Sequence, residues 1–196
     1  MIRAALTAIA ALTLTAPALA GHHEEGEAEM AHIGPMVGFD ASGFTALTPT
    51  GEAITLADIS GENGAVVVFS RSLDWCPFCQ NQSIDLIDAE EPLAELGWDL
   101  NLITYDSPVI LAAYASEKGI PYQLLSDTDS AMIDAFHLRN TEMPAGSRYD
   151  GIPHPAIIFI SPEGEVRAIL REEGYQDRPP VPLVLETATD LNGEVG

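Results

Sequence analysis

The only two cysteines of the chain follow directly on a strongly apolar segment, and this junction restricts the possible fold more than any other stretch. Residues 65–69 read AVVVF and predict a strand that is buried on both faces. A helix-compatible stretch begins just after Cys76 and Cys79. Because proline is tolerated in the first turn of a helix, Pro77 predicts that Cys76 lies at the helix N-terminus.

This position favours redox chemistry at Cys76. The free N–H groups and the dipole of a helix N-terminus stabilise a thiolate relative to the thiol. Cys79, one turn later, could then attack a mixed disulfide at Cys76 and release the substrate. A fixed structural disulfide and a metal site are the other two interpretations. We favour redox catalysis over a fixed disulfide, because closing a loop of only about four residues stabilises a fold least.

The first 20 residues are typical of a secretory signal peptide. They contain one arginine, an apolar run and the small-x-small ending Ala18-Leu19-Ala20. The apolar run is too short to predict a membrane span, and no cysteine follows the cleavage site to carry a lipid. We therefore expect export to a bacterial periplasm and no stable membrane anchor.

The chain is strongly acidic, with a formal net charge of −22. Because the signal peptide contains Arg3 and no acidic residue, the mature chain would carry −23. Such a surface repels nucleic acids and anionic membranes, so neither is expected as a partner. All basic residues except Lys118 are arginines, the better clamps for anions.

Residues 21–43 are rich in acidic and histidine side chains and lack periodicity, which predicts a flexible lead-in without an assigned function. Residues 44–196 then predict one α/β domain with a mixed sheet. It opens with a hairpin, and Pro92 is expected to kink or split the helix after the cysteines. The other expected elements are strands at 99–105, 122–125, 156–160 and 166–170, helices at 108–118, 127–137 and 182–191, and a loop at 140–151.

The combined pattern resembles the thioredoxin fold, and within it the peroxiredoxin-like branch of the redoxins, the alkyl hydroperoxide reductase and thiol-specific antioxidant family. The matching motifs are RSLDWCPFCQNQ, TYDSP, LLSD, GIPHPAIIFISPEGEV and EEGYQDRP. The resemblance implies a mixed central sheet flanked by helices, an N-terminal β-hairpin and an insertion before a strand led by a cis-proline. That proline would be Pro155, facing the dithiol and shaping a substrate groove. Trp75 and Phe78 would form an apolar rim beside the cysteines; ordinary packing is the other interpretation for both.

The same resemblance does not show which residues of this chain would donate hydrogen bonds to a peroxide. Family members carry Thr or Ser three residues before the reactive cysteine, where this chain has Leu73. His154 stands about where the family has an arginine, while Arg71 is close in sequence and Arg148 or Arg171 could fold in. His154 could raise the thiolate fraction of Cys76 or shuttle a proton, or it could simply contact solvent.

Asp74 is the one acidic residue next to the cysteine motif. A carboxylate two residues before Cys76 would disfavour the thiolate unless it points away.

The sequence thus predicts an exported thiol–disulfide oxidoreductase in which Cys76 attacks and Cys79 resolves. Arg71 or His154 would tune the thiolate. No cofactor is expected, and the electron donor or acceptor would be a thiol or disulfide protein. The first alternative is a thiol peroxidase, in which Cys79 condenses with a sulfenic acid on Cys76. The second is a copper(I) module with two thiolate ligands and His154.

Overall fold

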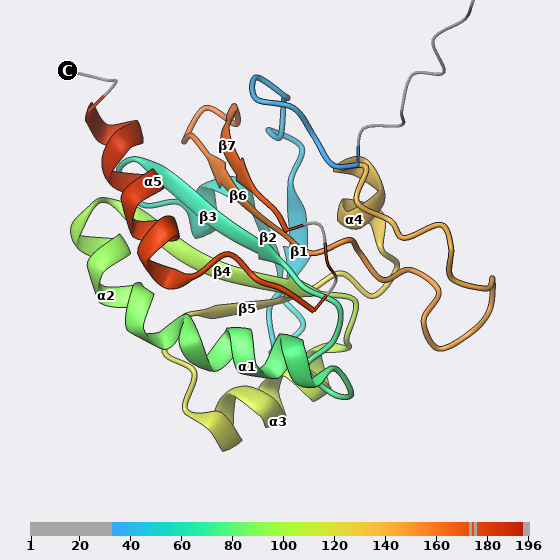
Figure 1. Ribbon diagram of the computed structural model, residues 1–196. Coiled ribbons are helices and arrows are strands. Elements are labelled where there is room, and N and C mark those ends of the chain that lie inside the picture. The colour runs from blue at the N-terminus through green and yellow to red at the C-terminus, as the bar shows by residue number, and fades with distance from the viewer. Residues whose placement is uncertain (1–32, 173, 175, 194–196) are drawn as a thin grey trace, which may run out of the picture. The chain divides into compact units, whose positions relative to one another are not determined.

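The computed structural model describes residues 33–172, 174 and 176–193 (Figure 1). The predicted signal peptide, and with it His22, His23 and His32, lies outside the described residues. Among the described helices, none is long and apolar enough to cross a membrane.

In the described part of the chain, seven strands form one mixed sheet in the order β2-β1-β5-β4-β3-β6-β7. β3 lies near its centre, parallel to β4 on one side and antiparallel to β6 on the other. All residues of β3 are buried, as the apolar run predicts. The strands are β1 Thr45–Leu47, β2 Ala53–Thr55, β3 Gly64–Phe69, β4 Trp98–Thr104, β5 Gln123–Ser126, β6 Ala156–Ile160 and β7 Val166–Leu170.

Both faces of the sheet are covered, so alternate residues of β3 enter two different cores. Val66 and Val68 pack with the helices on one face, whereas Ala65, Val67 and Phe69 pack with the segments on the other. Figure 1 shows α1, α2 and α5 in front of the sheet. The first face carries α1 Pro77–Asp85, α2 Ile87–Glu95, α3 Pro108–Lys118 and α5 Val181–Gly193, and the second carries the 3-10 helix η1 Leu56–Ile59 and α4 Ala131–Ala135.

The predicted hairpins and the helix predicted at 108–118 are confirmed. β1 pairs with β2, and β6 pairs with β7, both antiparallel. Helix α3 runs from Pro108 to Lys118 and is capped by Gly119, whose φ of 64° is the left-handed conformation that glycine adopts without strain. The predicted α/β fold, with a mixed central sheet flanked by helices, is therefore confirmed.

The helix after the cysteines does divide, but the prediction that Pro92 divides it is wrong. The break lies at Leu86, between α1 and α2, and Pro92 is inside α2. Pro92 has no backbone N–H to donate to the carbonyl of Asp88, four residues earlier. Because α2 begins at Ile87, Asp88 lies in the first turn of the helix. One bond is lost there, and the helix continues to Glu95.

The predicted lead-in extends too far toward the domain. Within residues 35–43, the Ala41 backbone N–H donates to the Gly164 carbonyl, and Asp40 forms an isolated antiparallel β-bridge with Glu165. The Phe39 ring lies 5.5 Å from the Phe136 ring. This segment therefore packs on the sheet instead of leading freely into it, because its few apolar side chains fit the second core.

Candidate active site

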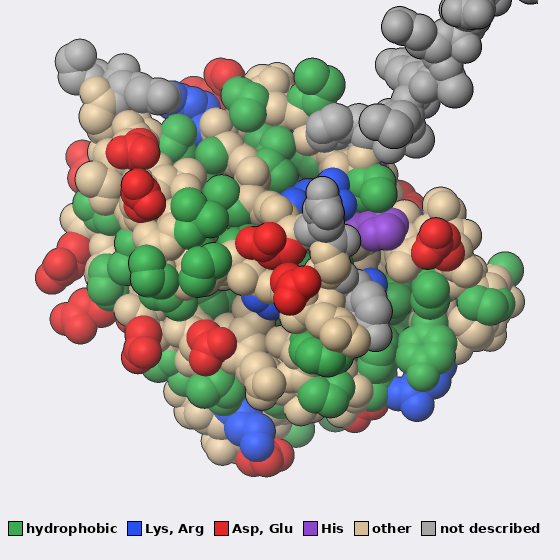
Figure 2. Space-filling model, in the orientation of Figure 1, with side chains coloured by type: hydrophobic (Ala, Val, Ile, Leu, Met, Phe, Trp, Pro, Cys, Tyr) green, Lys and Arg blue, Asp and Glu red, His purple; other side chains and the backbone are tan. Residues whose placement is uncertain are grey.

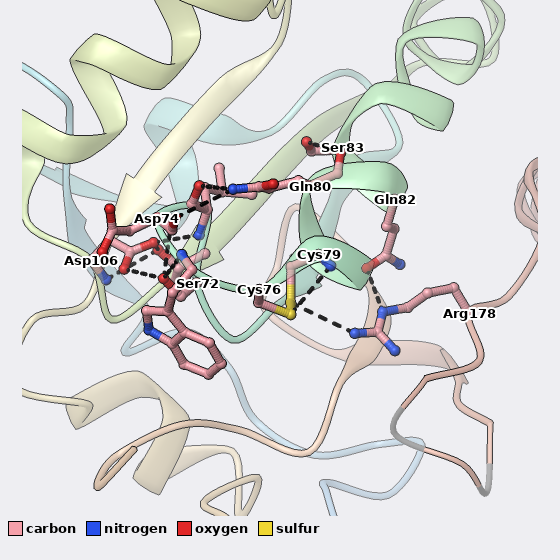
Figure 3. Close-up of a disulfide and its surroundings, with 12 residues drawn as sticks. Ser72, Asp74, Cys76, Cys79, Gln80, Gln82, Ser83, Asp106 and Arg178 are labelled. Atoms are coloured by element: carbon pink, nitrogen blue, oxygen red, sulfur yellow. Dashed lines mark hydrogen bonds between the residues drawn. A yellow bond between two sulfur atoms is a disulfide. The ribbon is translucent and has the colours of Figure 1, made fainter. Parts of the chain in front are cut away.

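The two cysteines form a disulfide at the N-terminus of α1 (Figure 3). Cys76 is the N-cap residue and Pro77 opens the helix, as the sequence predicts. The Cys76 Sγ accepts a hydrogen bond of 3.3 Å from the Cys79 backbone N–H. The Cys76 side chain is 4% exposed, whereas Cys79 is 0% exposed. An attacking thiol therefore reaches Cys76 more readily than Cys79.

The loop before Cys76 is fixed by a buried carboxylate that the sequence analysis did not assign. Asp106, just after β4, accepts hydrogen bonds from the Ser72 hydroxyl (2.7 Å), the Leu73 backbone N–H (2.6 Å) and the Thr104 hydroxyl (3.0 Å). Burial raises the pKa of Asp106, and these hydrogen bonds partly oppose that shift. The only sequence signal for Asp106 is its place in the TYDSP motif.

Asp74 does not face the disulfide. Figure 3 shows it beside Ser72 and Asp106, and its backbone N–H donates to the Ser72 hydroxyl at 3.1 Å. Its charge acts on Asp106, whose pKa it helps to raise. The expected penalty on the Cys76 thiolate is therefore weakened by this orientation.

Trp75 connects the loop before Cys76, called the cysteine loop, to the loop at 140–151, which is the insertion before β6. Its Nε1–H donates to the Tyr105 hydroxyl at 2.9 Å, and that hydroxyl donates to the Arg148 carbonyl. The Tyr149 ring meets Trp75 edge-on at 4.9 Å, and the Arg148 guanidinium lies 5.3 Å from the Trp75 ring centroid. The insertion is thus held on the residue adjacent to Cys76. Phe78, the other expected rim residue, is 37% exposed.

A pocket of about 520 Å³ lies beside this loop and contains four of the predicted site residues. Both arginine and carboxylate side chains contribute to its wall, together with apolar groups. The lining residues are Arg71, Trp75, Asn140, Glu142, Met143, Tyr149, Ile152, His154, Pro155, Arg171 and Glu172.

The prediction of a cis bond at Pro155 is wrong. Among the described residues no peptide bond is cis. The chain enters β6 already extended, because it pairs with residues 138 and 139. The His154 backbone N–H donates to the Leu138 carbonyl at 2.7 Å, and Pro153 forms an isolated β-bridge with Arg139. Pairing on this segment favours the trans bond, which is the more stable X-Pro isomer in any case. Pro155 nevertheless lines the pocket.

His154 lies in the pocket in an environment that favours its neutral form. Burial is the largest cause that lowers its pKa, followed by the charges of Arg171 and Arg71. A neutral imidazole can accept or relay a proton, but it adds no positive charge to stabilise a thiolate.

Arg178 is the second functional residue that sequence reasoning missed. It lies between β7 and α5, and its Nη2 is 3.7 Å from the Cys79 Sγ (Figure 3). Its Nε donates to the Gln82 side-chain oxygen at 2.9 Å. Burial and the nearby Arg71 lower the pKa of Arg178 to about 10. The available signal was its place in EEGYQDRP, a motif used only for the overall resemblance.

Metal ligation finds no support in the described part of the chain. No group of three or more His, Cys, Asp or Glu side chains is placed there to hold a metal ion. The copper(I) alternative would therefore rest on the two sulfurs alone, and these are joined in a disulfide.

Comparison with known proteins agrees with this architecture. The family model described as AhpC/TSA matches residues 37–169. The putative peroxiredoxin bcp of Haemophilus influenzae is 29% identical over 72% of this chain and 89% of its own length, and peroxiredoxin Bcp of Bacillus subtilis is 25% identical over 72% and 87%.

Solved structures show the same fold. Peroxidoxin BcpB from Mycobacterium tuberculosis has a TM-score of 0.66 at 18% identity, over 83% of this chain and 98% of its own. The thiol peroxidase from Chromobacterium violaceum has a TM-score of 0.66 at 23% identity, over 83% and 91%. With its family match over residues 37–169 and its dithiol at a helix N-terminus, the chain belongs to the AhpC/TSA family and is a thiol-dependent oxidoreductase.

Proposed function

We propose that the chain is a thiol peroxidase in which Cys76 reacts with the hydroperoxide and Cys79 resolves the product. The Cys76 thiolate attacks one peroxide oxygen, the O–O bond breaks, and an alcohol or water leaves after protonation. Cys79 then attacks the sulfenic acid on Cys76, forming the disulfide and releasing water. This ranks the sequence analysis's first alternative above simple disulfide exchange, because the family and the Bcp relatives favour it.

The observation that carries the proposal is a disulfide formed with α1 intact. Cys76 caps the helix and Cys79 lies in its first turn, yet the two sulfurs are already bonded. Resolution of a sulfenic acid on Cys76 therefore requires no unwinding of α1. One chain supplies both the sulfenic acid on Cys76 and the Cys79 thiol that reacts with it.

The proposal requires a donor for the peroxide other than a side chain at position 73. Leu73 is apolar, and its backbone N–H is already bonded to Asp106. Arg71 lines the pocket next to Trp75, so its guanidinium is our candidate for polarising the O–O bond. This assigns Arg71 a donor role as well as an effect on the thiolate.

Trapping of the sulfenic acid tests the proposal. In Cys79→Ser, one equivalent of hydrogen peroxide should give a stable sulfenic acid at Cys76 that reacts with dimedone, as read by mass spectrometry. The wild type should instead form the disulfide and give little adduct, and Cys76→Ser should give none. Absence of the adduct in Cys79→Ser, with both cysteines still reduced, would contradict the proposal.

Thiol–disulfide exchange remains the second candidate, and the Leu73 side chain favours it because it cannot donate a hydrogen bond to a peroxide. Reduction of insulin in the presence of dithiothreitol measures this activity. An exchange rate far above the peroxide rate would make it the main function.

We also propose export and a protein dithiol as electron donor. The pattern of residues 1–20 supports export, and the buried disulfide requires an external reductant to complete a cycle. N-terminal sequencing of the protein from a periplasmic fraction should begin after Ala20, whereas an intact Met1 in the cytoplasmic fraction would contradict export.

A further inference from the structure

We infer that Arg178 is a catalytic residue that stabilises the Cys79 sulfur as a thiolate when the disulfide is reduced. This rests on the proposed cycle only in that Cys76 is the attacked sulfur. It goes beyond the cycle by assigning a cation to the leaving sulfur.

The geometry places a positive charge on the buried member of the pair. Cys79 is 0% exposed, so water cannot stabilise a charge on its sulfur. The Arg178 Nη2 lies 3.7 Å from that sulfur, at hydrogen-bond distance for a sulfur acceptor. The two residues are 99 positions apart in the sequence, so this contact is made by the tertiary fold.

Arg178 is held in this position from two sides. Its Nε donates to the side chain of Gln82, one turn after Cys79 on α1, and Gln82 is itself buried. Its Nη1 donates to the Asp177 carbonyl at 2.7 Å. The arginine also lies three residues before α5, whose Val184 packs in the core. The guanidinium is therefore positioned before any charge develops on Cys79.

The surrounding charges also favour an anion at this place. The chain carries only eight Lys and Arg side chains against thirty Asp and Glu, and Figure 2 shows mostly isolated positive side chains on the face it displays. Yet Arg71 lies near enough to Arg178 to lower its pKa, with Asp177 acting in the opposite direction. The charge of Arg71 disfavours the charged form of Arg178, and a thiolate at Cys79 would oppose that effect.

The reduction step shows what the charge would do. A thiolate of a dithiol reductant attacks the Cys76 Sγ, the S–S bond breaks, and its electron pair passes to Cys79, beside Arg178. The second thiol of the reductant then displaces Cys76, and the reductant leaves as a disulfide. Because exchange is faster when the leaving thiol has a lower pKa, Arg178 accelerates the first of these steps.

Arg178→Gln tests this assignment without any peroxide. We expect the equilibrium with dithiothreitol to move about tenfold toward the disulfide, which is about 30 mV in reduction potential, and the rate of reduction to fall by a similar factor. The equilibrium and the rate for Arg178→Lys should lie between those of the wild type and Arg178→Gln. Lysine keeps the positive charge but lacks the planar guanidinium with its fixed N–H donors. Gln82→Ala should change both quantities in the same direction by less.

Lys118→Gln is the matched control, because it removes one positive charge from an exposed pair with Glu117 on α3. It should leave the potential and the reduction rate unchanged. Equal effects of Arg178→Gln and Lys118→Gln would overturn the assignment. If Arg178→Gln fails to fold, unchanged values for Arg178→Lys and Gln82→Ala would overturn it as well.

A titration separates a charge effect from a merely structural one. In the Cys76→Ser background, ultraviolet absorbance reports the Cys79 thiolate alone, and adding Arg178→Gln should raise its titration midpoint by about one pH unit. An unchanged midpoint would overturn the inference, even if the peroxidase proposal holds. Conversely, slow reaction with peroxide together with a shifted midpoint would reject the peroxidase and leave Arg178 in its role.

Discussion

The backbone N–H of Leu73 and the carboxylate of Asp106 are joined by a hydrogen bond of 2.6 Å, between two positions that lie 33 residues apart. The bond ties the loop before Cys76 to the end of β4. A position that the family resemblance assigns to a side-chain donor therefore contributes through its backbone to the shape of the loop.

Asp106→Asn should weaken this loop. The amide retains one acceptor oxygen but directs an NH₂ group toward donors, so at least one buried hydrogen bond is lost, at a cost of about 1–3 kcal/mol. Urea unfolding of the oxidised protein measures the loss, with exposed Asp85→Asn on α1 as the control. Equal stability of the two variants would contradict the role given to Asp106.

The pH dependence of the unfolding free energy, compared between the wild type and Asp106→Asn, provides a separate prediction. Because the pKa of Asp106 is raised in the fold, its protonated form contributes stability that is fully present below its ordinary pKa of 3.8. That contribution is lost as pH rises through the higher folded value. Asp106→Asn should lack this decline, so the stability difference between wild type and variant should change across that window. A constant difference would show that Asp106 keeps its ordinary pKa.

His154 should titrate below its ordinary value of 6.5, because burial and the charges of Arg171 and Arg71 disfavour the imidazolium. Its neutral form contributes stability that is present above pH 6.5 and lost as pH falls through the lower folded pKa. NMR titration of its ring protons gives the midpoint directly, and His137 provides a second histidine signal in the same spectrum. A midpoint for His154 at or above 6.5 would contradict the pocket electrostatics described above.

Tyr105→Phe should release the insertion from the cysteine loop. The change removes the acceptor for Trp75 and the donor to the Arg148 carbonyl, at about 1 kcal/mol for each hydrogen bond. Hydrogen exchange should become faster at residues 146–151. Tyr122→Phe is the control, because its hydroxyl donates to the Ser83 carbonyl at another place in the fold. Faster exchange at 146–151 in both variants, or in neither, would mean that this contact does not hold the insertion.

The sequence is most informative where local physics decides the structure. The β-branched run of β3, Pro77 in the first turn of α1 and Gly119 at the end of α3 each follow from the conformational preferences of a few adjacent residues. The break at Leu86 is different, because Leu86 is buried in the core and Pro92 is tolerated in α2. The trans bond before Pro155 is the more stable X-Pro isomer, and only the family resemblance predicts the cis form.

The site residues that sequence reasoning missed share this dependence on distant parts of the chain. Asp106 meets the cysteine loop from the end of β4, and Arg178 meets Cys79 from just before α5. Neither contact leaves a local pattern, because acids and arginines are ordinary surface residues in a sequence. Both residues fall within motifs that supported only the resemblance.

The rate at which the reduced protein reacts with a hydroperoxide decides between a peroxidase and a disulfide-exchange enzyme. Stopped-flow tryptophan fluorescence can follow it, because Trp75 adjoins Cys76. We predict a second-order rate constant about a thousandfold or more above that of a free thiolate, roughly 4 kcal/mol of barrier, with much of this acceleration lost in Arg71→Gln. A rate within about tenfold of the free thiolate, roughly 1.4 kcal/mol, would contradict the peroxidase and leave disulfide exchange as the function.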